Sequence, residues 1–226
     1  MNPTIPSVVI PGGLAPGRSS TASTRTVFWR VELWAFAVLI GLLNLPLFTG
    51  GFPTMFNFLP DAVSAGEWWR VITHPFVHVS FYHLLLDASV FFLLYAELRD
   101  KAWFERFTLL LSAGAGSLLV SLWAGPTIQT RGLCGFSGIA HGLAAVSALE
   151  MMRGAKDKTL WRVGLASLLL VVAKSLVEAV TGHIAIQWLH FGQLGFPIAA
   201  CHAGGVLGAL LAWLGVSSRQ KRQPQP

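Results

Sequence analysis

The sequence predicts an all-α membrane protein built as a bundle of six transmembrane helices. Of the 226 residues, 54% are hydrophobic and only 12% are charged, which is about half the charged fraction of an average soluble domain. The apolar residues form six long runs, and about 20 apolar residues span a bilayer as a helix. Runs of this length exclude a soluble domain with a large core. The runs are 27–48, 74–98, 107–123, 133–152, 160–180 and 197–216.

Basic residues predict the orientation of these helices. Most of the 16 Lys and Arg residues fall in the two tails, at the start of the first run, and in the connections after the second and fourth runs, whereas Arg70 and Arg131 fall on the opposite side. Because cytoplasmic segments of membrane proteins are rich in Lys and Arg, both termini are expected in the cytoplasm, with the chain in the inner (plasma) membrane. The net charge of +6 follows from this asymmetry, so no nucleic-acid partner is expected. The residues on the cytoplasmic side are Arg18, Arg25, Arg30, Arg99, Lys101, Arg106, Arg153, Lys156, Lys158, Arg162, Arg219, Lys221 and Arg222.

The runs divide the chain into one domain between two short tails. Residues 1–26 are rich in Pro, Gly, Ser and Thr, a composition typical of a flexible segment. Residues 27–216 hold all six runs, and residues 217–226 are polar and contain proline. We therefore expect a single membrane domain at 27–216 with both tails in the cytoplasm.

Polar side chains open three of the six runs. The second, fourth and sixth runs all lead from the outer side of the membrane to the inner side. At 1.5 Å per residue, the polar residues at their beginnings lie in the outer part of the membrane, at a common depth. Such residues are costly inside a membrane and mark functional sites. They are His74, His78, His83 and Asp87 in the second run, Ser137 and His141 in the fourth, and His202 in the sixth.

Ser137 and His202 have the surroundings expected of a nucleophile and its base. Gly135 and Gly138 flank Ser137, and glycine permits a sharp turn at a nucleophile. A serine that starts a helix lies beside free backbone N–H groups, which can stabilise an oxyanion. Small residues in the fourth and sixth runs allow close helix contact, which would bring His202 to Ser137 and predicts a serine hydrolase acting inside a bilayer. These small residues are Gly138, Gly142, Ala145, Gly204, Gly205, Gly208 and Ala209.

The polar residues of the second run leave two arrangements open. A step of four residues places His83 and Asp87 on one helix face. His74 and His78 share that face if the helix reaches them, and belong to the loop before it if the helix begins near Ser80. Any of these histidines could also serve only to tie helices together through hydrogen bonds.

Other chemistries fit some of the same residues. His and Asp on one helix face can bind zinc, but the chain has no His-Glu-x-x-His motif and a serine nucleophile needs no metal, so neither a metal nor a cofactor is expected. His141 lies four residues after Ser137 on the same helix face and is the alternative base. Lys174 and Glu178, four residues apart in the fifth run, are expected to form a structural ion pair.

The order and spacing of these motifs resemble those of the rhomboid intramembrane serine proteases. The segment 69–87 is similar to the Trp-Arg motif of the family's first loop and to its second helix. The segment 135–138 (Gly-Phe-Ser-Gly) resembles the nucleophile motif, and the segment 202–205 (His-Ala-Gly-Gly) resembles the base motif of the sixth helix. The resemblance covers about residues 28–216. Its Gly-Phe-Ser-Gly-Ile-Ala-His-Gly form is most similar to the rhombosortase subgroup.

The resemblance implies a fold and a role for each residue. The fold would be a six-helix rhomboid-like bundle in which Ser137 and His202 form a catalytic dyad. The backbone N–H of Ser137 and the side chain of His83 would bind the oxyanion, and His78 and His141 would support the site.

Asp87 is a departure from the family pattern. The family's oxyanion hole also uses an asparagine four residues after the histidine of the second helix, and here that position is Asp87. An ionised carboxylate would repel the oxyanion. Either Asp87 is protonated, because burial favours the neutral carboxyl group, or it accepts a hydrogen bond from His83 and orients that ring. We expect the second arrangement, because a buried His–Asp pair neutralises itself.

The expected function is an intramembrane serine endopeptidase. Its partner would be a membrane-anchored protein substrate, cut near the outer face of the bilayer where a helix-breaking residue exposes the peptide bond. The likeness to rhombosortases implies a C-terminal Gly-Gly anchor as the target. One alternative is an inactive relative that only binds transmembrane helices, which Asp87 alone favours. Another is a proton-coupled carrier using the same buried residues, although the sequence lacks the paired inverted halves of carriers.

Overall fold

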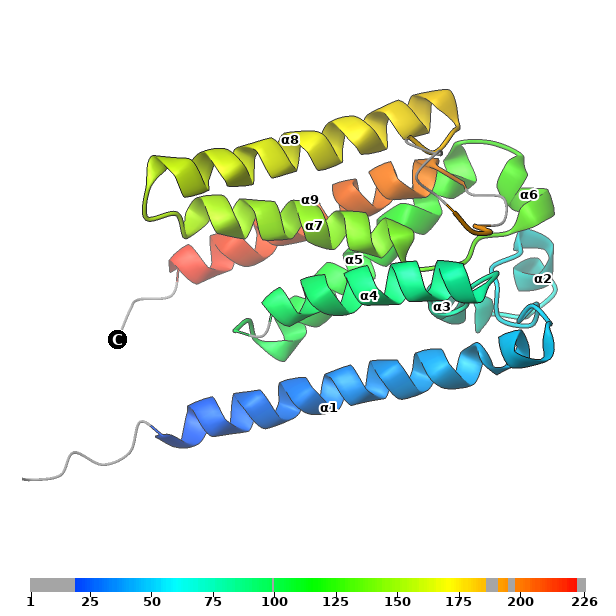
Figure 1. The fold of residues 1–226 in the computed structure, drawn as a ribbon, viewed down its shortest axis with the longest axis horizontal. Coiled ribbons are helices and arrows are strands. Elements are labelled where there is room, and N and C mark those ends of the chain that lie inside the picture. Colours follow the sequence, from blue (N-terminus) through cyan, green and yellow to red (C-terminus); the bar gives the residue numbers. More distant parts are fainter. Residues whose placement is uncertain (1–18, 99, 186–190, 195–197, 223–226) are drawn as a thin grey trace, which may run out of the picture.

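In the part of the chain that the computed structural model describes, six long helices lie side by side (Figure 1). The described residues are 19–98, 100–185, 191–194 and 198–222. Across these ranges the chain has no β-strand, only an isolated bridge between Phe58 and Leu133. The prediction of an all-α membrane bundle is confirmed. The long helices are α1 (Ser19–Leu43), α4 (Phe81–Glu97), α5 (Trp103–Trp123), α7 (Ser137–Arg153), α8 (Lys158–Thr181) and α9 (Ala200–Arg222).

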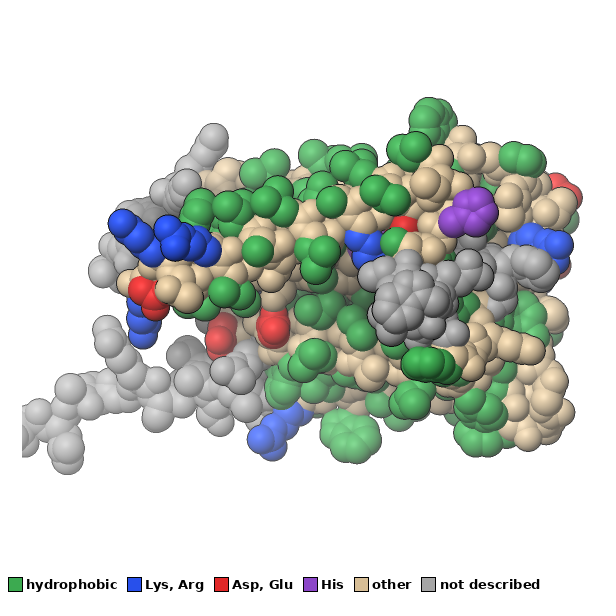
Figure 2. Space-filling view, turned by 45° about the horizontal axis from the view of Figure 1, so that its top comes forward, with side chains coloured by type: hydrophobic (Ala, Val, Ile, Leu, Met, Phe, Trp, Pro, Cys, Tyr) green, Lys and Arg blue, Asp and Glu red, His purple; other side chains and the backbone are tan. Residues whose placement is uncertain are grey.

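Length and hydropathy mark most of these helices as membrane spans, and the chain is an integral membrane protein. The 17-residue helix α7 is shorter and contacts α4, α5, α8 and α9, so protein rather than lipid covers much of it. Figure 2 shows hydrophobic side chains spread along one outer face of the bundle, as a lipid-facing surface requires. Among the described residues, four stretches are long and apolar enough to cross a bilayer: Trp29–Thr49, Trp103–Trp123, Lys158–Thr181 and Ala200–Ser218. The segments Arg70–Phe76 and Phe81–Glu97, which are bent by 92° relative to each other, make a fifth if the pair is counted as one span.

The first and last helices extend into both predicted tails. Helix α1 begins at Ser19 and α9 ends at Arg222, so both helices extend beyond the first and last apolar runs. Neither extension contains Gly or Pro, and lengthening an existing helix costs far less than starting one. Basic residues at the end of α9 also favour its continuation, because cations stabilise a helix C-terminus. Residues 1–18 and 223–226, and with them Arg18, lie outside the described residues, as do Arg99 and Pro197.

The two ends of the bundle carry different connections. The described ends of the chain, the α4–α5 connection and the α7–α8 connection gather at one end, on the left of Figure 1. The predicted basic connections therefore share one end of the bundle with both termini of the described chain. The opposite end carries short helical turns that join α1 to α4 and α5 to α7. These turns are η1 (Leu45–Thr49), α2 (Pro60–Ser64), α3 (Arg70–Thr73), η2 (His74–Phe76) and α6 (Thr127–Arg131).

Helix α4 begins later than the second apolar run predicts. Its N-cap is Ser80, whose Oγ accepts a hydrogen bond from the backbone N–H of His83 at 3.1 Å. Pro75 interrupts the preceding segment, because proline has no N–H to continue a helix. His74 consequently lies in η2 and His78 in the loop after it. The expectation of one helix over 74–98 is wrong, and the alternative that places both histidines before the helix is confirmed.

Glycines let α9 lie directly against α5 and α7. A Cβ atom added at Gly204 would overlap the carbonyl group of Gly116 on α5, and one added at Gly205 would overlap that of Gly138 on α7. Backbones approach this closely only where side chains are absent. The predicted tight contact between the fourth and sixth helices is confirmed, and it sets the beginning of α9 against the beginning of α7.

Candidate active site

A cavity of about 700 Å³ lies between α4, α7, α8 and the beginning of α9. Most of its lining is apolar, from side chains such as Leu86 and Leu170. Five of the six predicted site residues line it, and His78 does not. The polar or ionisable side chains on its wall include His83, Asp87, Ser137, His141, Lys174 and His202.

Ser137 is the first residue of α7 and follows a turn that requires glycine. Gly135 has a φ of 94°, a conformation that glycine adopts without steric cost. A Cβ atom at Gly135 would also lie 2.8 Å from Oδ2 of Asp87 and 2.9 Å from Nε2 of His83. The turn therefore brings the backbone before Ser137 directly against these two side chains of α4.

The loops at this end of the bundle hold the turn in place. The backbone N–H of Gly135 donates to the carbonyl of His74 at 3.1 Å, and Phe58 and Leu133 exchange two backbone hydrogen bonds of 2.9 Å. Arg70 is buried and donates to the carbonyl oxygens of Thr54 and Asn57 at 2.6 and 2.8 Å. Arg70, the arginine of the Trp-Arg motif, thus holds the segment beside Phe58, and Phe58 in turn bonds to the backbone of Leu133 before Ser137.

The hydroxyl group of Ser137 contacts the residue that precedes the predicted base. Its Oγ lies 3.6 Å from Sγ of Cys201, and Cys201 is a free thiol. None of the hydrogen bonds found between described residues joins Ser137 to His202. Catalytic hydrogen bonds are often long or poorly aligned before substrate binds, so this geometry is compatible with a pair that tightens in the complex.

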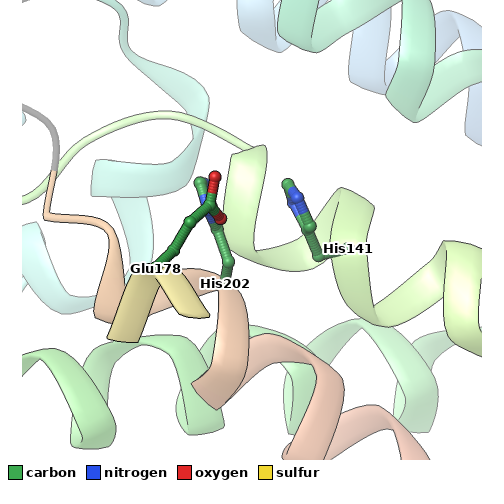
Figure 3. A group of neighbouring side chains, drawn as sticks. All are labelled: His141, Glu178 and His202. Atoms are coloured by element: carbon green, nitrogen blue, oxygen red, sulfur yellow. The ribbon is translucent and has the colours of Figure 1, made fainter. Parts of the chain in front are cut away.

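His202 is held from α8 (Figure 3). Its Nδ1 lies 2.6 Å from Oε2 of Glu178, a residue with no exposed surface. Lys174, one turn earlier on α8, donates to both oxygens of the same carboxylate at 2.7 and 2.9 Å. The ring of His141 stacks on that of His202, with centroids 3.9 Å apart and planes inclined by 14°. These four residues from α7, α8 and α9 form the Glu178 cluster.

Both ring nitrogens of His141 are engaged by other groups. Its Nδ1 lies 2.7 Å from the carbonyl oxygen of Ser137 and must carry a proton to bond with an acceptor. Its Nε2 then accepts from Nζ of Lys174 at 2.9 Å. No ring nitrogen of His141 is left to take the proton of the serine hydroxyl, so the geometry favours His202 as the base.

The Glu178 cluster also has the composition of a metal site. One ligand atom from each of His141, Glu178 and His202 lies within 4.8 Å of the others. The Lys174 ammonium group, however, already bonds to two of these residues. The stacked imidazole rings are nearly parallel, so their lone pairs do not converge on one point as tetrahedral zinc requires. The arrangement of these residues therefore fits the side-chain ammonium group of Lys174 better than a metal ion.

A second group of histidines and a carboxylate borders the same cavity. Oδ2 of Asp87 lies 3.3 Å from Nε2 of His83 and 3.5 Å from Nε2 of His78. The rings of His78 and His83 meet edge to face, with centroids 5.0 Å apart. No described residue hydrogen-bonds to Oδ2 of Asp87, to Nδ1 of His83 or to either ring nitrogen of His78, although all these atoms are buried. These three residues form the Asp87 cluster.

The sequence analysis missed the contact between α8 and His202. It predicted a structural ion pair between Lys174 and Glu178, and that ion pair is present. The same carboxylate also reaches His202 from a helix that carries no catalytic motif. A signal was available, because a charged side chain within a membrane span is costly and marks a functional site.

Comparison with known proteins adds a family match. A family model described as the Rhomboid domain matches residues 65–218, which is more than half of the chain. The match takes in Ser137 and every residue of the Glu178 and Asp87 clusters. A comparison with curated proteins found no match.

Proposed function

The chain belongs to the rhomboid family, and from this premise we propose that it is an intramembrane serine protease with Ser137 as its nucleophile and His202 as its base. The family consists of serine proteases that act within membranes. The observation that carries the proposal is the convergence of Ser137, His202 and His83 from three helices on one largely apolar cavity. Polar groups inside a membrane protein carry a cost that a function explains better than packing does.

The proposed reaction proceeds through an acyl-enzyme. Ser137 Oγ attacks the carbonyl carbon of the scissile peptide bond and passes its proton to Nε2 of His202. The C–N bond then breaks, and His202 gives that proton to the leaving nitrogen. Water attacks the resulting ester, its proton passes through His202 back to Ser137 Oγ, and the product carboxylate leaves.

The beginning of α7 supplies candidate donors for the oxyanion. The first N–H groups of a helix have no partner within that helix. No backbone hydrogen bond between described residues engages the N–H groups of Ser137 or Gly138. These groups, together with a ring N–H of His83, support an oxyanion hole beside the nucleophile, where each donor is worth roughly a hundredfold or more in rate.

The substrate that we propose is a membrane-anchored protein cut near the outer face of the bilayer. A helical peptide bond is shielded by its own hydrogen bonds, so the cleaved segment must contain a helix-breaking residue. The rhombosortase-like form of residues 135–142 supports a C-terminal Gly-Gly anchor as the specific target. Basic residues at one end of the bundle support an inner-membrane domain over 27–216 with both termini in the cytoplasm.

A fluorophosphonate probe tests the proposed nucleophile. The detergent-solubilised full chain should be labelled, and Ser137→Ala should abolish the labelling. Ser121→Ala is a control serine substitution, because Ser121 is buried on α5, donates to the carbonyl of Ser117 and is not among the residues that line the cavity. Cys201→Ala should also keep the labelling, which separates a serine nucleophile from a thiol. Equal labelling of wild type and Ser137→Ala contradicts the assignment.

Two further experiments test the substrate and the orientation. Co-expression with proteins that carry C-terminal Gly-Gly anchors should give cleavage by wild type and none by Ser137→Ala. Cleavage of other single-span proteins but not of these anchors would favour a general rhomboid specificity. A cytoplasmic reporter fused after Pro226 should be active and a periplasmic reporter silent, and the reverse pattern overturns the proposed orientation.

A further inference from the structure

Glu178 is a buried carboxylate whose hydrogen-bonding capacity is filled. Its Oε2 bonds to Nδ1 of His202 at 2.6 Å, and its Oε1 accepts from the backbone N–H of Ala185 at 2.8 Å. Lys174 bonds to both oxygens, and Glu178 itself is 0% exposed. A buried charge is tolerated when it is paired and fully hydrogen-bonded, so Glu178 is suited to remain ionised beside His202.

The contact with His202 determines which ring nitrogen can act as a base. A carboxylate only accepts hydrogen bonds, so Nδ1 of His202 must carry the proton. Nε2 is then the unprotonated nitrogen that can take the proton from Ser137. The negative charge of Glu178 also stabilises the imidazolium that forms when His202 accepts this proton.

We propose that Glu178 is a positioning residue that holds His202 in its productive tautomer and orientation, so that Ser137, His202 and Glu178 act as one three-residue unit in which Glu178 stays ionised. This inference rests on the proposed protease function. It assigns to α8 a part in the chemistry that neither Ser137 nor His202 provides.

The rest of the cluster fixes the carboxylate and the ring from opposite sides. Lys174 ties Glu178 to His141, and His141 stacks on the His202 ring while its Nδ1 bonds to the carbonyl of Ser137. The contacts form a closed circuit through α7, α8 and α9 that returns to Ser137. Figure 3 shows three of its members, His141, Glu178 and His202. A ring held on two sides loses little freedom in the reaction, which is how orientation contributes to rate.

A purely structural ion pair is the competing explanation, and Glu178→Gln separates the two. Glutamine keeps the shape but removes the charge, and its amide group can present a donor to Nδ1, which favours the wrong tautomer. Glu178→Asp keeps the charge on a shorter side chain and should recover part of the rate. Glu150→Gln is the matched control, because Glu150 also ties helices together, through Lys101 at 2.8 Å and Trp213 at 2.6 Å, but lies outside the cluster.

The experiment measures the rate and the saturation constant of fluorophosphonate labelling, with thermal stability, for the full chain in detergent. For Glu178→Gln we expect the maximal labelling rate to fall about a hundred- to ten-thousandfold, as it does when the carboxylate of a serine triad is neutralised. The saturation constant should stay near that of wild type, because the probe still enters the cavity. Glu150→Gln should label at the wild-type rate whatever its stability.

The outcomes separate this inference from the proposed function. Labelling of Glu178→Gln at the wild-type rate overturns the positioning role while leaving Ser137 as the nucleophile. A loss that only follows the folded fraction, equally large in Glu178→Asp, also overturns it and assigns Glu178 to stability. If wild type is not labelled above the level of Ser137→Ala, the proposed function fails, and the positioning role fails with it.

Discussion

The Glu178 cluster and the Asp87 cluster border one cavity and each combine two histidines with a carboxylate, yet they are built differently. In the Glu178 cluster, the carboxylate accepts hydrogen bonds of 2.6 to 2.9 Å. In the Asp87 cluster, the nearest histidine nitrogens lie at 3.3 and 3.5 Å, and several buried ring nitrogens have no hydrogen bond to a described residue. The carboxylate of the Glu178 cluster has all its hydrogen bonds made within the described chain. The Asp87 cluster leaves buried polar atoms without a hydrogen bond to a described residue.

This difference matches two different tasks in acyl transfer. A base must hold one orientation and one tautomer before the reaction, so a closed set of hydrogen bonds suits it. An oxyanion hole must keep donors for a charge that arrives only in the transition state. Buried donors without partners carry a free-energy cost, and a bound substrate can relieve it. We infer that the Glu178 cluster serves the base and the Asp87 cluster serves the oxyanion.

The largest predicted effect comes from removing the ring that the Glu178 cluster holds. His202→Ala should lower the rate of substrate cleavage by at least about a thousandfold, because no other group among the described residues is positioned to take the serine proton. His141→Ala should be milder, since His141 stacks on His202, bonds to a backbone carbonyl and accepts from Lys174, and so has no free ring nitrogen for the serine proton. Cleavage assays on both variants decide this. If His141→Ala is the inactive variant and His202→Ala retains turnover, the base is misassigned.

The second prediction concerns a substitution that would move α9, which carries His202, away from α7, which carries Ser137, without changing a polar residue. Gly205→Ala places a methyl group against the carbonyl of Gly138, so α9 must move away from α7 and carry His202 from Ser137. We expect a loss of stability of about 1–3 kcal/mol, typical of overpacking, and a loss of labelling larger than the loss of folded protein. Gly215→Ala on the same helix is the control, because nothing lies within 4 Å of its added Cβ. Equal behaviour of the two variants contradicts the dependence on close packing.

Much of the fold follows from features that depend only on local sequence. Long apolar runs predict membrane helices because every backbone polar group must be satisfied inside lipid. Small residues at helical spacing correctly predicted the contact between α7 and α9. The beginning of α4 was left open between two positions, because hydropathy alone does not register Pro75 or the capping hydroxyl group of Ser80. Helices α1 and α9 extend beyond their apolar runs, because a helix can continue into polar residues that contain no Gly or Pro.

The candidate site was predictable where glycine motifs surround a reactive residue, as at Ser137 and His202. Glu178 was not, because its contact with His202 depends on how α8 is rotated and placed relative to α9. A spacing of four residues identified its partner on the same helix, Lys174. No local pattern reports a contact between two residues on different helices that are 24 positions apart in the chain, as Glu178 and His202 are. The approach of His78 to Asp87 was missed for the same reason, since His78 reaches it from a loop.

The third prediction breaks the Asp87 cluster. Asp87→Ala removes the only acidic group beside His83 and His78 in this cluster, and should lower the cleavage rate about a hundredfold, the typical cost of losing one oxyanion donor. If Asp87 orients a donor that is used in the transition state rather than in the ground state, the loss should appear mainly in kcat. Steady-state kinetics test this. Wild-type kcat in Asp87→Ala would leave Asp87 with a structural role only.

The smallest expected effect is the most informative about Asp87. Asp87→Asn keeps the size of the side chain, removes its charge and introduces the residue typical of the family at this position. If Asp87 orients His83 as an ionised acceptor, the asparagine carbonyl can still accept from that ring while its amide group offers a new donor to the oxyanion. The two changes oppose each other, so we expect the rate to change by less than about tenfold, well below the cost of a lost donor. Cleavage rates measured side by side for wild type, Asp87→Asn and Asp87→Ala provide the comparison. A loss in Asp87→Asn as large as in Asp87→Ala would mean that the negative charge itself is required. The Asp87 cluster would then resemble the Glu178 cluster in its need for an ionised carboxylate as well as in its two histidines.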